Sequence, residues 1–170
     1  MRLSLALLGF SLLAAQPGGA QNLNADATVP AHARAVLHVE GRGVQIYTCA
    51  QPGGVSYEWA LKAPEAKLFD ASSQEVGTHS AGPTWTWKDG SSITGKLLEK
   101  RASSEALSIP WLLLAATRAS DRPGVLTGIA FVRRSETQGG IAPADGCDAS
   151  HAGATVRVPY TATYTFYKSE

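Results

Sequence analysis

From Ala35 to the C-terminus, short runs of β-forming residues alternate with glycine- and proline-containing turns roughly ten residues apart. Each run is long enough for one strand and too short for a stable helix. This spacing is typical of an all-β sandwich or barrel. We therefore expect a single antiparallel β-domain over residues 35–170, with about nine or ten strands.

Several turns in this pattern predict how consecutive strands are joined. Asp89-Gly90 lies between "TWTWK" and "SSITGKLLE" and is the strongest hairpin signal in the chain. The "ASS" segment between "AKLFD" and "QEVGTH" is a second hairpin candidate. Gly41-Arg42-Gly43, between "AVLHVE" and "VQIYTC", predicts a hairpin or a glycine bulge.

Two runs indicate which faces are buried. "IPWLLLAAT" is apolar on both faces and predicts a strand that is covered on both sides; Pro110 and the short length disfavour a buried helix. The last run, "RVPYTATYTFYK", alternates strictly, so that threonines occupy one face and the other carries Tyr160, Ala162, Tyr164 and Phe166.

The first residues have the layout of a secretory signal peptide. Met1-Arg2 precedes the apolar stretch "LSLALLGFSLLAA", and small residues follow it in "QPGGAQ". We predict removal of residues 1–20, a flexible lead-in over residues 21–34, and an exported protein in the periplasm or outside the cell. The apolar stretch is shorter than the roughly 20 residues of a membrane helix, and no other segment predicts one in the mature chain.

Charge argues against two classes of partner. The chain has 15 basic and 14 acidic residues, and loss of Arg2 with the leader would balance them. Nucleic acids and anionic membranes require clustered positive charge, so neither is expected as a partner. The sequence does not predict the oligomeric state.

The cysteines fit an exported protein. Cys49 and Cys147 are the only two, and an even pair in an oxidising compartment predicts a disulfide bond. A reactive thiol or a metal ligand is the alternative. The bridge would connect an early strand to a late loop.

No motif predicts a metal, a cofactor or a known catalytic nucleophile. No G-x-S-x-G motif is present. Asp145 and Asp148 stand among glycines and could hold calcium, although turn residues beside a disulfide explain them equally well. None of the histidines lie at a typical metal-ligand spacing: His32, His38, His79 and His151.

The segment "GTHSAGPTWTWKDG", residues 77–90, is the candidate functional site. If the strands around His79 and Trp85 pair, these two side chains and Asp89 could converge on one rim. A histidine oriented by a carboxylate beside an indole could bind a sugar or small molecule, or act as an acid-base pair. The structural alternative has Trp85 and Trp87 in the core, Asp89 capping its own turn and His79 bonded to a backbone carbonyl.

An ordered series of motifs resembles one family. "GVQIYTC", "VGTHSAGPTW", "DGSSITG", "IPWLLL", "TQGGIAPADGCD" and "RVPYTATYTFY" are similar to the secreted bacterial and fungal proteins of domain-of-unknown-function family 3455, over about residues 29–168. The resemblance implies an exported single-domain protein. It brings no reaction, ligand or catalytic residue, but both cysteines lie in motifs of the family.

Three functions remain open from the sequence. The first is a non-enzymatic β-domain that binds a small molecule or a surface glycan at the rim formed by residues 77–90. The second is a hydrolase or isomerase that uses His79 with Asp89 or another nearby carboxylate. The third is a structural or adhesive envelope protein without a pocket.

Overall fold

A computed structural model describes residues 29–170, so the predicted signal peptide over residues 1–20 lies outside the described residues, as does most of the predicted lead-in. Two short 3-10 helices, η1 (Pro52–Gly54) and η2 (Ala149–His151), interrupt the loops. The described strands are β1 (Ala33–Ala50), β2 (Glu58–Phe69), β3 (Glu75–Ser80), β4 (Thr84–Trp87), β5 (Ser92–Arg101), β6 (Trp111–Arg118), β7 (Phe131–Gly139) and β8 (Thr155–Ser169).

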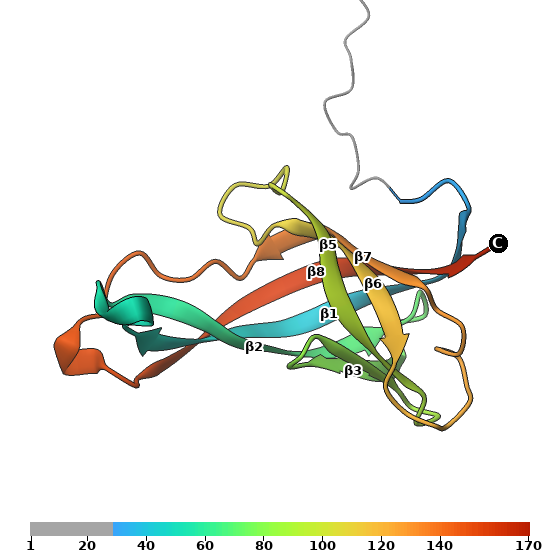
Figure 1. The fold of residues 1–170 in the computed structure, drawn as a ribbon, viewed down its shortest axis with the longest axis horizontal. Helices are drawn as coiled ribbons and strands as arrows, with labels where there is room; N and C mark the ends of the chain where they lie inside the picture. Colours follow the sequence, from blue (N-terminus) through green and yellow to red (C-terminus); the bar gives the residue numbers. More distant parts are fainter. Residues whose placement is uncertain (1–28) are drawn as a thin grey trace, which may run out of the picture.

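The strands form one closed antiparallel barrel in chain order (Figure 1). Each strand pairs with the next, and β8 returns to pair with β1 along nearly its whole length. The predicted all-β class is therefore confirmed, in its barrel form. Closure satisfies the hydrogen-bonding groups that the edge strands of an open sheet would leave unpaired.

The number of strands differs from the expectation: residues 29–170 contain eight strands, whereas the sequence pattern predicts nine or ten. "AVLHVE" and "VQIYTC" belong to one strand, β1, and "SYEWALK" and "AKLFD" fall largely within another, β2. Gly41 and Gly43 make no turn. A Cβ at Gly41 would lie 2.5 Å from Cε2 of Tyr164, so this glycine admits an aromatic ring against the backbone.

Other local predictions are confirmed. The Asp89-Gly90 turn joins β4 to β5, and Gly90 has the positive φ of 86° that glycine adopts without strain. The "ASS" turn joins β2 to β3. "IPWLLLAAT" supplies β6, whose Leu113 and Leu114 are both buried although they point to opposite faces.

The barrel core follows the alternation of β8. One face of this strand is buried inside the barrel, from Tyr160 through Tyr164 to Phe166, as the sequence predicts. These side chains pack against others from the remaining strands, among them Val39, Leu68, Trp85, Ile93, Leu114 and Val132.

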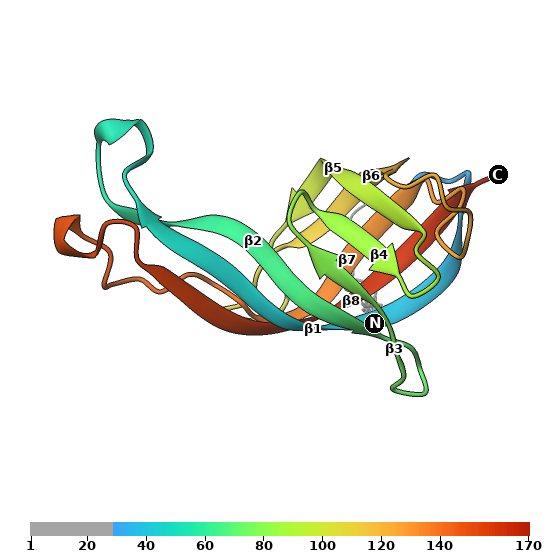
Figure 2. The same ribbon diagram turned by 90° about the horizontal axis from the view of Figure 1, so that it is seen from below.

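Three strands continue beyond the barrel as a long ribbon (Figure 2). In this extension β1 pairs with β2 on one side and with β8 on the other, past the last pairs of β3 and β7. The predicted disulfide, Cys49–Cys147, is present and joins the end of β1 to the β7–β8 loop. It secures the loops at the tip of the extension, far from the β3–β4 hairpin (Figure 2).

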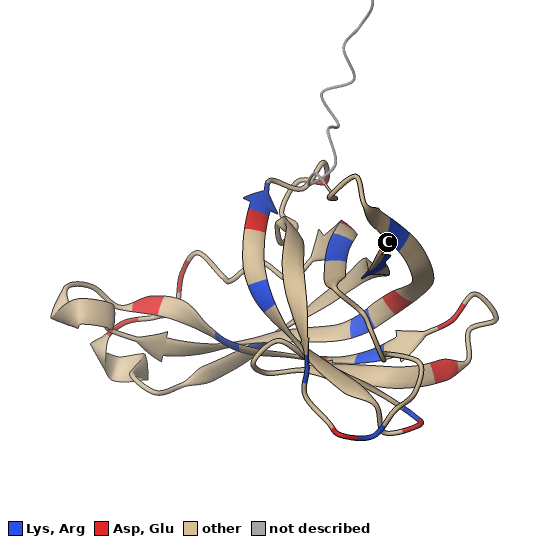
Figure 3. Ribbon diagram, turned by 45° about the vertical axis from the view of Figure 1, so that its right-hand side comes forward, with Lys and Arg blue, Asp and Glu red and all other residues tan. Residues whose placement is uncertain are grey.

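Charged residues of both signs are interspersed over the strands and loops (Figure 3). Several form exposed ion pairs, such as Lys67 with Glu75 and Arg157 with Glu65. Among residues 29–170, no helix has the length and apolar character needed to cross a membrane.

Candidate functional site

A cavity of about 260 Å³ opens at the end of the barrel, where β1 and β2 leave it to form the extension. β2 pairs with β3 only over residues 66–69. The part of β2 that precedes Ala66 has no neighbouring strand on that side among the described residues, and the resulting gap in the barrel wall forms the mouth of the cavity. Much of the lining is apolar: Leu61, Ala63, Pro64, Pro83, Leu112 and Leu114.

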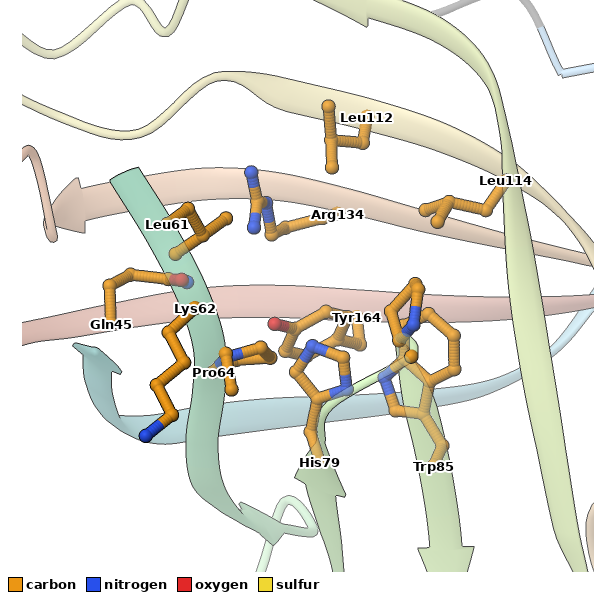
Figure 4. Close-up of a pocket in the computed structure, with 13 residues that line it drawn as sticks. Gln45, Leu61, Lys62, Pro64, His79, Trp85, Leu112, Leu114, Arg134 and Tyr164 are labelled. Carbon is orange, nitrogen blue, oxygen red and sulfur yellow. The ribbon is translucent and has the colours of Figure 1, made fainter. Parts of the chain in front are cut away.

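Polar side chains from six strands line the same cavity (Figure 4). The guanidinium of Arg134 and the amide of Gln45 lie on one side, and Trp85 and Leu114 lie on the other (Figure 4). Lys62 is exposed at the mouth. The full polar set is Gln45, Lys62, His79, Trp85, Arg134 and Tyr164.

His79 is buried in the cavity wall with 3% of its surface exposed. Its Nδ1 lies 3.0 Å from the carbonyl oxygen of Thr84 and must donate there, which leaves Nε2 as an acceptor when the ring is neutral. Burial, supported by the charge of Arg134, lowers the pKa of His79 to about 4, although the Thr84 bond opposes the shift. The ring is therefore neutral at pH 7.

Trp85 is the partner of His79. The two residues are directly paired across β3 and β4, and their rings stack with centroids 4.5 Å apart and an interplanar angle of 14°. The sequence-predicted pair is thus brought together, but inside the barrel, because Trp85 is 1% exposed. Its indole Nε1 has no hydrogen-bond partner within residues 29–170.

Asp89 is not part of this arrangement. It lies in the β4–β5 turn, at the far end of β4 from the His79 pair. Its Oδ1 accepts from the backbone and hydroxyl of Ser91, and its Oδ2 accepts from the backbone of Val125. Because of these bonds, led by the Ser91 hydroxyl, the pKa of Asp89 is lowered. The expected convergence of His79, Trp85 and Asp89 is therefore wrong for Asp89.

Gln45 is a site residue that the sequence did not reveal. Its side chain is 2% exposed, yet neither Oε1 nor Nε2 has a hydrogen-bond partner within the described chain. Leaving a buried amide unpaired costs about 1–3 kcal/mol for each group. Such an unpaired group in a folded protein requires an explanation, and a ligand in the cavity is one way to supply the missing hydrogen bonds.

Arg134 brings a positive charge to the same side of the cavity. It is 9% exposed, and its Nε and one terminal nitrogen donate to the carbonyl oxygen of Pro110 at 3.1 and 2.7 Å. No aspartate or glutamate of the described residues forms an ion pair with it. A guanidinium has five N–H donors, so its hydrogen-bonding capacity is not exhausted.

Tyr164 is the remaining polar residue of the cavity wall. Its hydroxyl lies 3.1 Å from that of Tyr160, and its ring centroid is 5.1 Å from that of His79. Burial raises the pKa of Tyr164, while the charge of Arg134 and the side-chain hydrogen bonds to Tyr160 and Arg134 act in the opposite direction. Tyr164 therefore enters the site as a neutral hydroxyl.

The described residues contain no cluster of three potential metal-ligating side chains. In the loop considered for calcium, Asp148 Oδ1 accepts from Ser150 and His151 and caps η2. The backbone carbonyl of Asp145 accepts from the indole of Trp59. The carboxylate of Asp148 is thus engaged within its own turn.

Comparison with known proteins gives a family without an assigned activity. Residues 30–168 match the family described as protein of unknown function, DUF3455. The chain belongs to the DUF3455 family. No curated protein and no solved structure matches it. The DUF3455 match covers all eight strands up to Lys168 and so includes every residue of the cavity wall.

In this DUF3455 chain, the sequence pattern indicates two of the polar cavity residues, His79 and Trp85, but not the others. His79 and Trp85 were recognised because they stand close together in the chain. Gln45 and Arg134 come from strands that meet only when the barrel closes. The one available signal was a glutamine inside "VQIYTC", where the pattern alone does not distinguish a cavity-facing residue from a solvated one.

Proposed function

We propose that the protein is an exported binding protein that holds a small organic molecule in the cavity at the end of the barrel. The observation that carries this proposal is the amide of Gln45, which is buried in the cavity wall and unpartnered within residues 29–170. A ligand would satisfy this amide, as well as the indole Nε1 of Trp85.

The size and walls of the cavity favour a small molecule over a glycan chain. A dry protein cavity of about 150 Å³ holds a benzene molecule. The 260 Å³ here thus accommodates one ring with a short substituent. Glycans are commonly bound on exposed aromatic surfaces, but Trp85 and His79 are nearly inaccessible from outside.

Two sequence features support export. The basic start and apolar stretch of residues 1–20 have the order of a signal peptide. The Cys49–Cys147 bond is of the kind that persists in oxidising compartments.

The enzymatic alternative has less support from the geometry. The hydrolase or isomerase hypothesis pairs His79 with Asp89 or another nearby carboxylate as acid-base partner. No aspartate or glutamate lines the cavity within the described residues, and Asp89 is engaged elsewhere. The envelope-protein alternative requires no pocket and becomes the better explanation if no ligand binds.

The proposal is tested by ligand-observed NMR on the oxidised protein, with a set of single-ring acids, amides, alcohols and amines. A Leu112→Trp variant would fill the cavity, since Leu112 lines it. A Leu98→Trp variant is the matched control, because Leu98 is 52% exposed on β5 and is not part of the cavity wall. We expect binding to the wild type and to Leu98→Trp, but not to Leu112→Trp.

Two results would contradict the proposal. One is the absence of binding by every compound in the set. The other is equal binding to both tryptophan variants, since the ligand would then occupy another part of the surface.

A further inference from the structure

The charge balance of the cavity suggests the chemical class of its ligand, provided that the proposed binding function holds. Arg134 is nearly buried and forms no ion pair with a carboxylate of the described chain. A buried charge without a counter-charge is costly, and such charges are normally paired. The bonds to the carbonyl of Pro110 supply a dipole but no negative charge.

Within residues 29–170, no other group of the cavity wall compensates this charge. His79 is neutral at pH 7 because burial lowers its pKa to about 4, and the hydroxyl of Tyr164 is neutral because burial raises its pKa. The remaining ionisable wall residue, Lys62 at the mouth, is also basic. The cavity of the described chain is therefore electropositive and would attract an anion.

The arrangement of donors points in the same direction. Figure 4 shows the Arg134 guanidinium and the Gln45 amide on one side of the cavity, with Trp85 and Leu114 on the opposite side. Guanidinium groups match the planar geometry of carboxylates, and an amide Nε2 adds a donor. We infer that the ligand is a small organic carboxylate whose acid group is held by Arg134 and Gln45 and whose apolar part lies against Trp85 and Leu114.

A ligand of this kind would contact both sides of the cavity. A carboxylate would pair with the guanidinium and with Nε2 of Gln45, the buried amide that lacks a partner in the described chain. A ring or short chain would fill the space beside the stacked His79 and Trp85. Inorganic anions would contact only the side formed by Arg134 and Gln45, so an organic acid should bind more tightly than sulfate or phosphate.

The test compares three compounds of nearly the same shape: 3-phenylpropionate, 3-phenylpropionamide and 3-phenylpropylamine. Calorimetric titration at pH 7 should give about tenfold or greater preference for the acid over the amide, since charge-assisted hydrogen bonds are the stronger kind. The amine should bind least. The preference should fall below about twofold in Arg134→Gln and in Gln45→Glu.

Gln45→Glu keeps the test decisive if Arg134→Gln does not fold. It preserves the shape of a side chain that has no hydrogen-bond partner among the described residues, and it places a negative charge where the acid group would lie. Arg157→Gln is the charge control: it removes one positive charge from an exposed residue that pairs with Glu65 and does not line this cavity. Its preference for the acid should be unchanged.

Equal affinity of the wild type for acid and amide would overturn the inference and leave the proposed binding function standing. A preference that persists in Gln45→Glu would also overturn it, because the acid would then be bound elsewhere. Failure of all three compounds, in a protein that binds a neutral molecule from the wider set, overturns the carboxylate assignment alone. Failure of every compound overturns both.

Discussion

The imidazole of His79 lies flat against the indole of Trp85, with ring centroids 4.5 Å apart, and both side chains are buried in the wall of one cavity. The register of β3 and β4 produces this stack, because His79 and Trp85 are directly opposite each other in the hairpin. Stacking and the bond from Nδ1 to Thr84 hold the imidazole in place, and this bond does not use Nε2.

Titration of His79 should make stability depend on pH in a defined window. Its pKa is about 4 in the folded protein and 6.5 in the unfolded chain. The unfolded chain therefore binds more protons between these values, and the free energy of unfolding should fall as the pH drops from 6.5 to about 4. The loss attributable to this residue should be about 3 kcal/mol at most.

Urea denaturation across this pH range measures the effect. Carboxylates also titrate there, so the comparison is with His79→Gln, which can still donate to the Thr84 carbonyl but does not titrate. The variant should show a shallower fall than the wild type. Parallel curves would contradict the assigned protonation state of His79.

Trp85 should contribute strongly to stability. It is 1% exposed and contacts the rings of His79, Tyr164 and Phe166. Trp85→Ala should therefore cost about 3–5 kcal/mol, as for other buried aromatic residues. Trp87→Ala is the control: Trp87 is partly exposed and should cost less. If urea denaturation gives equal losses in the free energy of unfolding for the two variants, the prediction for Trp85 is contradicted.

Replacement of Gln45 should stabilise the empty protein and weaken ligand binding. Gln45→Leu removes two buried polar groups that have no partner within residues 29–170, and retains most of the volume. We expect a gain of about 1 kcal/mol in the free energy of unfolding. A loss of stability would indicate that the amide has a structural partner, such as a buried water molecule.

Asp89 should be structural and not part of the binding site. Asp89→Ala should lower the melting temperature and leave the affinity for cavity ligands unchanged, since its carboxylate bonds to Ser91 and Val125. Asp70→Ala is a matched control, because Asp70 accepts from Ser72 and Gln74 in its own turn only. The Asp89 variant should melt lower, since it also loses the bond to a second loop. Loss of affinity at unchanged stability would contradict this role.

Sequence alone predicted features that depend on neighbours in the chain. The alternation in β8 gave the buried face correctly, and Asp89-Gly90 gave the β4–β5 turn. It could not show whether Gly41 ends a strand or makes room for a ring, because this depends on Tyr164, a residue of another strand. The same limit explains why Gln45 and Arg134 were missed, while His79 and Trp85, joined by a hairpin, were found.

The most direct test of the cavity as a binding site is the NMR signal of the Trp85 indole N–H during titration with 3-phenylpropionate. Assignment by Trp85→Phe distinguishes it from the other indoles, such as that of Trp59, which donates to the carbonyl of Asp145 in the extension. We predict a saturable shift of the Trp85 signal with little change at Trp59. An unchanged Trp85 signal at a concentration that saturates binding, or equal shifts at both indoles, would contradict ligand binding inside the barrel.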